Sequence, residues 1–183
     1  MDAIVKGQMF ITAKKWAETQ SEEKKKMFYQ KVSPELLKRL ENNYVGLVTP
    51  IEAKYYIEWV DVAIEVYGED SIKKVSDFIA VENLSTFLKF LMKIGSPSYI
   101  ASNFPKAHRL YFNQSEINIM KLNKKNLALE LVNGEVYGKG MCIGLQSWVS
   151  KALEYSGAKK LQSSHSECKH KGQERCVFVF HWS

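Results

Sequence analysis

Residues 160–182 read KLQSSHSECKHKGQERCVFVFHW, and this stretch predicts how the second half of the chain folds. Two strand-like runs, Lys160–Cys168 and Arg175–Trp182, flank a short polar segment that contains a glycine and is typical of a turn. A connection this short can join only antiparallel strands. Because Cys168 and Cys176 stand on either side of the turn, we expect their side chains to lie close together.

The segments before this hairpin extend the pattern upstream. Apolar residues recur at helical spacing from Lys139 to Tyr155, and Gly157 ends that helix. Before the helix, Ile117–Leu122 and Leu127–Val132 show period-two alternation on either side of a polar turn, which indicates a β-hairpin. The order β-β-α-β-β predicts a mainly antiparallel sheet with helices packed on it.

The first half of the chain carries the start and stop signals of helices. A serine or threonine before a proline or acidic residues marks four helix starts: Ser21–Glu23, Ser33–Pro34, Thr49–Glu52 and Ser96–Pro97. The third start precedes an apolar face that ends near Gly68, and Phe78–Met92 indicates more helix up to Gly95. We therefore expect an α+β fold in one domain, residues 1–183. A mostly helical lead-in, 1–109, would precede an α+β core, 110–183.

Composition and charge argue against several classes of function. The chain has 183 residues and a formal net charge of +6, but its lysines are scattered and lie in no base-reading motif, so we expect no nucleic-acid partner. No apolar run approaches the ~20 residues of a membrane span, and no signal peptide is visible, so we expect a cytoplasmic protein with reduced thiols. The odd count of three cysteines also argues against a disulfide framework.

The three cysteines point to a metal site. Cys142 falls in the first turn of the predicted helix 139–155, where the helix dipole favours a thiolate, while Cys168 and Cys176 flank the final turn. If this helix packs its N-terminus over the strand ends, three thiolates converge. A structural Zn²⁺ then needs one more ligand to close its tetrahedral site. The alternative interpretation is three core cysteines that bind no metal.

Three side chains near the final turn are candidates for the fourth ligand: His165, Glu167 and His170. We favour His165, because imidazole is a better zinc donor than an exposed carboxylate. In a regular strand, however, His165 and Cys168 point to opposite faces, so this choice requires a β-bulge between them.

These residues resemble the end of the 4-vinyl reductase domain. The similarity covers roughly residues 110–182 and includes the glycine-containing turn between Cys168 and Cys176, the closing CVFVFHW, and Gly138–Gly144 at the start of the last long helix. In the phenol- and toluene-sensing bacterial activators that carry this domain, zinc is held by a cysteine of that helix, two hairpin cysteines and an acidic residue. His165 takes the place of the acidic residue here.

The helical lead-in, with Val5–Gly7 and Asn103–Pro105, is also similar to a paralogous family of mostly uncharacterised myxobacterial proteins. Both groups share the fold of the transport protein particle (TRAPP) subunits, a ligand-binding fold of the nitric-oxide-signalling type. The resemblance therefore implies a TRAPP-like α+β domain that forms a homodimer through its helices and can hold an apolar ligand. The phenol sensors anchor phenol with a histidine and a tryptophan. Lys121 falls near the position of the tryptophan, and only His108, which no motif supports, could correspond to the histidine, so phenol binding is not inferred.

The motifs favour a binding function over catalysis. No nucleophile elbow, phosphate loop, dinucleotide fingerprint or metalloprotease motif occurs, and a zinc with four protein ligands has no open position for a reaction. We expect a non-enzymatic sensory or regulatory domain that signals through a partner protein. Its ligand would be an apolar or aromatic small molecule or a lipid, held in an apolar cavity of several hundred Å³. Four aromatic residues are expected to line this pocket: Phe104, Tyr111, Phe112 and Trp148.

An alternative function belongs to another class. The chain could be a protein-interaction module without a small ligand, in which the apolar face from Tyr56 to Val66 forms a homodimer interface. Such an adaptor would have a filled core and a large exposed apolar patch, whereas a sensor would have an enclosed apolar cavity.

Overall fold

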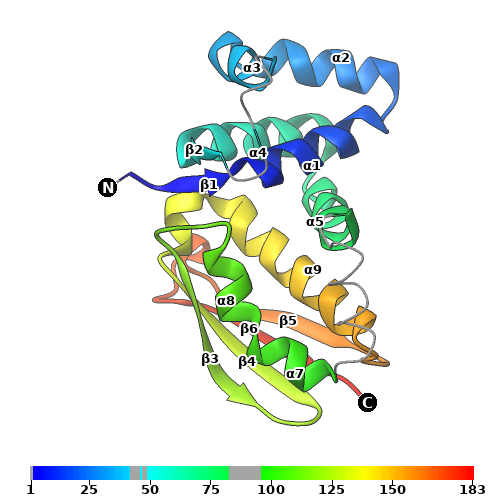
Figure 1. Cartoon of the computed structure of the whole chain (residues 1–183), viewed down its shortest axis with the longest axis vertical. Helices are drawn as coiled ribbons and strands as arrows, with labels where there is room; N and C mark the ends of the chain where they lie inside the picture. The colour runs from blue at the N-terminus through cyan, green and yellow to red at the C-terminus, as the bar shows by residue number, and fades with distance from the viewer. Residues whose placement is uncertain (1, 42–45, 47–48, 83–95) are drawn as a thin grey trace.

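A computed structural model describes residues 2–41, 46, 49–82 and 96–183 (Figure 1). The elements follow one another as β1 (Ile4–Lys6), α1 (Gly7–Glu18), α2 (Glu22–Lys31), α3 (Pro34–Glu41), β2 (Pro50–Glu52), α4 (Ala53–Tyr67), α5 (Asp70–Glu82), α7 (Pro97–Ser102), α8 (Phe104–Arg109), β3 (Glu116–Leu122), β4 (Asn126–Val132), η1 (Gly134–Tyr137), α9 (Lys139–Tyr155), β5 (Gln162–Glu167), η2 (Lys169–Lys171) and β6 (Cys176–His181). The end of the helix expected to reach Gly95 lies outside the described residues.

The second half of the chain forms a four-stranded antiparallel sheet in the order β3-β4-β6-β5 (Figure 1). This confirms the α+β fold and both predicted hairpins. The central strands β4 and β6 send one set of alternating side chains into the core, and these are almost fully buried: Leu127, Leu129, Leu131, Phe178 and Phe180. The sheet therefore presents one apolar face, which must be covered.

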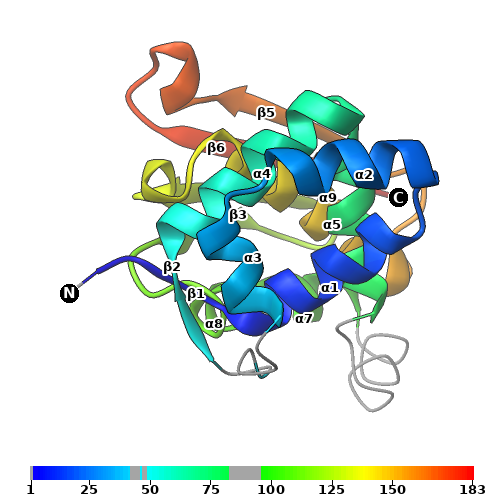
Figure 2. The ribbon, with the colours of Figure 1, turned by 90° about the horizontal axis from the view of Figure 1, so that it is seen from above.

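Helices α7, α8 and α9 lie against the sheet, and α4 and α5 of the first half pack on α9 from the other side (Figures 1 and 2). Two glycines of α9 permit this close packing. A Cβ atom at Gly140 would lie 2.1 Å from Cγ1 of Val60 in α4, and one at Gly144 would lie 2.9 Å from Oγ of Ser76 in α5. α9 is therefore in close contact with both helices.

Residues 50–52 contradict the prediction that a helix starts there. They form β2, which pairs antiparallel with β1 through Ile4↔Glu52, Val5↔Ile51 and Lys6↔Pro50. The helix begins only at Ala53, and Glu52 makes no side-chain capping hydrogen bond. The physical reason is tertiary, because the strand conformation buries Ile51 to 2% exposure, which a local capping signal does not report.

The other predicted helix starts are confirmed. The hydroxyl groups of Ser21, Ser33 and Ser96 accept hydrogen bonds from backbone amides three residues further on, at 3.5, 3.2 and 3.2 Å. Gly68 ends α4 with a φ of +86°, a conformation that glycine adopts without strain. The short helix α8 was not predicted from the sequence.

The apolar face of α4 that was considered for a homodimer lies inside the chain. Trp59 and Ala63 are at most 5% exposed, and the Trp59 ring meets Phe28 of α2 at 4.7 Å and Phe10 of α1 at 6.5 Å between centroids. The centre of this face is covered by α1 and α2, while Ile57, Ile64 and Val66 are partly buried. None of the described helices combines the length and the apolar character needed to cross a membrane.

Candidate functional site

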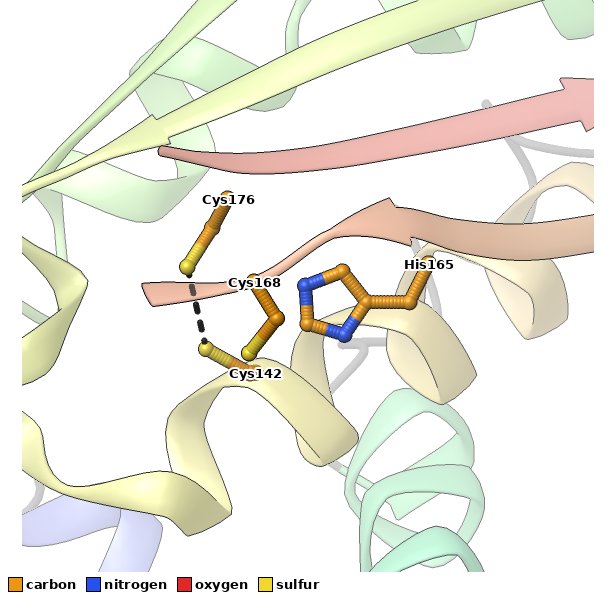
Figure 3. A group of neighbouring side chains, drawn as sticks. All are labelled: Cys142, His165, Cys168 and Cys176. Atoms are coloured by element: carbon orange, nitrogen blue, oxygen red, sulfur yellow. Dashed lines mark hydrogen bonds between the residues drawn. The ribbon is translucent and has the colours of Figure 1, made fainter. Parts of the chain in front are cut away.

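Three cysteines and one histidine converge where α9 meets the ends of β5 and β6 (Figure 3). Cys142 projects from the first turns of α9, Cys168 follows β5, and Cys176 opens β6. Their donor atoms and those of His165 all lie within 4.8 Å of one another. The three cysteines are between 0 and 5% exposed. Segments far apart in the sequence thus bring four metal-binding side chains into one buried cluster.

A bulge in β5 places His165 in this cluster. The pairing of β5 with β6 shifts register between His165, opposite Phe178, and Glu167, opposite Val177. This irregularity allows His165 and Cys168 to face the same side, as its ligand role requires. The His165 ring also stacks on Phe178, with 4.2 Å between centroids and 17° between planes. The stacking holds the imidazole beside the sulfurs.

The donor set fits a tetrahedral metal ion. The Sγ atoms of Cys142 and Cys176 are 3.6 Å apart, and two thiolates on one zinc ion lie about 3.8 Å apart because each Zn–S bond is about 2.3 Å. All three cysteines are free thiols. Nε2 of His165 is buried and has no hydrogen-bond partner, alone in this respect among the side-chain atoms of the described residues. A buried polar atom without a partner is costly, and a metal ion would satisfy it.

The other two candidates for the fourth ligand lie outside the cluster. Glu167 makes a bidentate ion pair with Arg175, at 2.8 and 3.1 Å. His170 is exposed in η2. The tight turn of η2 adds backbone support, because the amide of Lys169 points at Sγ of Cys176 from 3.4 Å. Such N–H contacts stabilise a thiolate and orient a metal ligand.

Burial controls the protonation of the cluster. It raises the pKa of the Cys142 thiol, and the neighbouring Cys176 raises it further. In the cluster without metal, burial thus opposes the helix dipole, which favours a Cys142 thiolate. Burial also lowers the pKa of His165, with a further contribution from Lys171. His165 is then neutral, the form that binds a metal ion.

An apolar cavity of about 80 Å³ lies on the other side of α9, among α1, α4, α5 and the segment that follows α8. Its aromatic wall consists of Phe10, Tyr56, Trp59, Tyr111, Phe112 and Trp148. Aliphatic side chains, methionines, small residues and His108 complete the wall, and no lysine, arginine, aspartate or glutamate lines it among the described residues. The cavity is smaller than the several hundred Å³ expected, because these aromatic rings fill much of the space between the helices.

The structure brings three of the four predicted pocket residues to this cavity. Tyr111, Phe112 and Trp148 line it. Phe104 does not, but its ring packs against Trp148 at 5.4 Å between centroids. Whether these residues bind a ligand remains a prediction.

His108 also lines the cavity, although no sequence motif had indicated a position in a pocket. It is 4% exposed, its Nε2 lies 2.7 Å from Oγ of the buried Ser115, and its ring stacks on Phe112 at 4.9 Å. Burial lowers the pKa of His108 to about 4, so the imidazole is neutral near pH 7. His108 lies between charged residues in the sequence Lys-Ala-His-Arg, and such a sequence does not predict a buried side chain.

The fold matches solved structures, although no protein-family model and no curated protein matches the chain. An H-NOX protein from Shewanella oneidensis in the Fe(II)NO ligation state is 17% identical over 97% of this chain and 99% of its own, with a TM-score of 0.70. The unliganded Fe(II) H-NOX protein from K. algicida is 9% identical over 97% and 96%, with a TM-score of 0.72. A structure described for the modulation of heme redox potential through porphyrin distortion is 12% identical over 81% and 87%, with a TM-score of 0.55.

Identities this low establish a shared fold. They agree with the coarser part of the resemblance drawn from the sequence, a ligand-binding fold of the nitric-oxide-signalling type. The chain has the fold of the H-NOX proteins, and its Cys/His cluster and apolar cavity lie on two sides of one helix of that fold.

Proposed function

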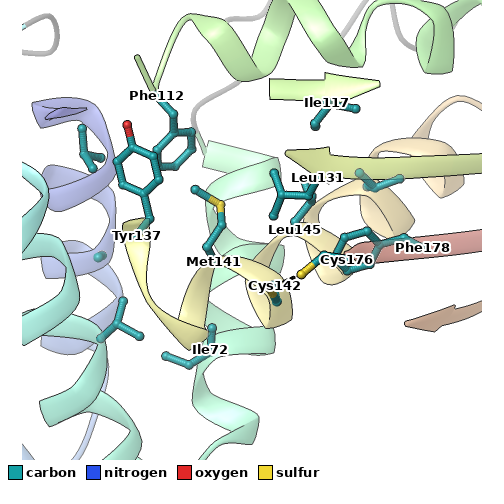
Figure 4. Packing of buried hydrophobic residues seen from close by; sticks show 14 of the residues in the cluster. Ile72, Phe112, Ile117, Leu131, Tyr137, Met141, Cys142, Leu145, Cys176 and Phe178 are labelled. Carbon is teal, nitrogen blue, oxygen red and sulfur yellow. Dashed lines mark hydrogen bonds between the residues drawn. The ribbon is translucent and has the colours of Figure 1, made fainter. Parts of the chain in front are cut away.

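We propose that this chain is a non-enzymatic sensory domain with an apolar ligand cavity and one structural Zn²⁺ held by Cys142, His165, Cys168 and Cys176. The observation that carries the proposal is the placement of α9. Adjacent residues of this helix serve the two sites: Met141 lines the cavity and Cys142 belongs to the cluster (Figure 4). A ligand that shifts α9 would therefore act on the metal-bound end of the sheet.

The two sites are close enough to interact electrostatically. Burial raises the pKa of the cavity residue Tyr56, and the nearby Cys142 adds to this effect. The zinc would join α9, β5 and β6 at one point, because its four ligands come from these three elements and their ends. Structural zinc contributes directly to the free energy of folding. We infer that the metal keeps one wall of the cavity fixed while the opposite helices remain free to respond.

Some structures of this fold hold iron or heme, so the cavity must be compared with a heme. His108 is the one imidazole in the lining among the described residues, but its Nε2, a nitrogen that could bind iron, is already engaged by Ser115. No cationic side chain of the described lining could pair with the two propionate carboxylates. The volume of about 80 Å³ is also far below the ~300–1,000 Å³ of sites for drug-sized ligands. The described residues do not fit a heme, and no function is derived through one.

Metal content tests the zinc proposal. The chain, purified without chelators, should contain about one zinc ion per molecule by mass spectrometry, because the four donors form a closed site. The variants His165→Ala and His170→Ala form a matched pair in the same turn region. The first should lose most of the zinc and the second should keep it. Equal zinc content in the two variants would contradict the proposed ligand set.

The adaptor function receives less support. The apolar face between Tyr56 and Val66 packs within the chain, and four large apolar side chains are exposed among the described residues: Met27, Tyr99, Leu110 and Met120. They come from different elements. A homodimer, a signalling partner, a cytoplasmic location and membership of the 4-vinyl reductase family stay predictions.

A further inference from the structure

The chemistry of the cavity restricts its occupant more closely than the fold does. Two features decide this: the lining residues that the structure describes include no lysine, arginine, aspartate or glutamate, and few polar atoms reach the cavity. A charged ligand would lose its hydration without gaining a counter-ion, which is strongly unfavourable. The occupant must therefore be uncharged and mainly apolar.

The volume sets an upper limit on size. An engineered protein cavity of about 150 Å³ with aliphatic and aromatic walls stays dry and binds benzene or xenon. The cavity here, at about 80 Å³, is roughly half as large and has a similar lining. It suits a molecule of a few heavy atoms, such as a dissolved gas or a short hydrocarbon.

We propose that this cavity binds a small uncharged apolar molecule directly, without heme, and that His108 serves as a wall residue anchored to Ser115. This inference rests on the proposed sensory function and departs from the heme found in some structures of the fold. The hydrogen bond to Ser115 at 2.7 Å and the stack on Phe112 hold the imidazole against the wall. The apolar walls then supply the binding energy by dispersion and by exclusion of water.

The small residues of the wall give a direct test. Ala63 of α4 and Ala13 of α1 both line the cavity and are buried. Ala63→Leu adds branched carbon to a space of this size and should fill it. Ala13→Val is a milder change that fills less and tolerates packing better. Ala107→Val, on α8 and outside the lining, is the matched control.

The experiment uses xenon as the apolar probe and hemin as the competing ligand. Xenon pressure should shift the methyl NMR signals of Met141 and Leu145 saturably. Ala63→Leu should weaken this response about tenfold, which corresponds to about 1.4 kcal/mol. Ala13→Val should weaken it to a smaller degree, and Ala107→Val should leave it unchanged. Hemin should give no stoichiometric absorption band that depends on His108.

One heme per chain, with a spectrum that changes in His108→Ala, would overturn the inference and leave the sensory function standing. If the chain binds neither xenon nor hemin, both this inference and the proposed sensory function are overturned. A xenon response that persists in both filled variants would also overturn the assignment to this cavity.

Discussion

The buried imidazole of His108 predicts a specific loss of stability in acid. The side chain is 4% exposed and burial alone lowers its pKa, from an ordinary value of about 6.5 to about 4. In the folded chain His108 is therefore neutral down to about pH 4. In the unfolded chain the same imidazole takes up a proton below about pH 6.5.

The magnitude follows from the two pKa values. Between pH 6.5 and pH 4 the unfolded state binds more protons than the folded state, so the free energy of unfolding falls as the pH falls. A pKa lowered from 6.5 to about 4 corresponds to a loss of about 3 kcal/mol once the pH is below 4. Above pH 6.5 the imidazole is neutral in both states and contributes nothing to the pH dependence.

The variant His108→Gln isolates this effect, because glutamine has a polar amide for Ser115 but does not titrate. We expect wild type to lose about 3 kcal/mol more than the variant between pH 7 and pH 4. The assay is urea unfolding at a series of pH values. Any acid release of the proposed zinc would occur in both proteins and cancel in the difference. His181→Gln, at an exposed histidine on β6, is the matched control and should follow wild type.

Parallel pH curves for wild type and His108→Gln would refute the reasoning. They would mean that the imidazole becomes protonated in the folded state without penalty. An NMR titration of His108 then gives a direct reading, since its signal should not titrate above about pH 5 if burial acts as described.

Three further substitutions test the packing. Gly140→Ala should destabilise the chain by about 1–3 kcal/mol in urea unfolding, because its Cβ would lie 2.1 Å from Val60, and Val60→Ala in the same chain should recover part of the loss. Tyr137→Phe removes a buried hydroxyl that accepts hydrogen bonds from two backbone amides and donates one to a backbone carbonyl, all at 3.1 Å. The free energy of unfolding should fall by about 1–3 kcal/mol, and hydrogen exchange of those two amides should become faster. Lys160 has a φ of +49°, so Lys160→Gly should raise the midpoint of thermal unfolding by relieving about 0.5–1 kcal/mol of net strain, while Lys159→Gly should not.

Local signals were sufficient wherever a structural feature depends on neighbours in the chain. The serine caps at Ser21 and Ser33 act within a single helical turn, so their hydrogen bonds could be predicted directly. Helical periodicity likewise defined α9 from Lys139 to Tyr155, and alternation defined the β3–β4 hairpin. The cysteines on either side of the final turn could be placed near each other for the same reason.

Local sequence signals failed where the neighbouring residues are compatible with two different structures. Thr49–Glu52 has the pattern of a helix start, yet residues 50–52 pair with β1, and the partners Ile4 and Glu52 are 48 positions apart in the chain. The sequence left three candidates for the fourth ligand open, because the one that lies beside the cysteines is decided by a bulge in β5, which arises from its pairing with β6. Neither strand pairing, β1 with β2 or the bulged pairing of β5 with β6, can be predicted from the local sequence.

The residue types of the Cys/His cluster could thus be predicted from the sequence, because cysteines and histidines around one turn already limit the chemistry. The sequence did not predict the size of the cavity, its neutral lining or the role of His108. Its walls come from α1, α4, α5, α9 and the segment around α8, and their distances are set by how the helices pack, including the close approach at Gly140 and Gly144. A volume left between packed elements is a property of their arrangement in space, and no single segment encodes it.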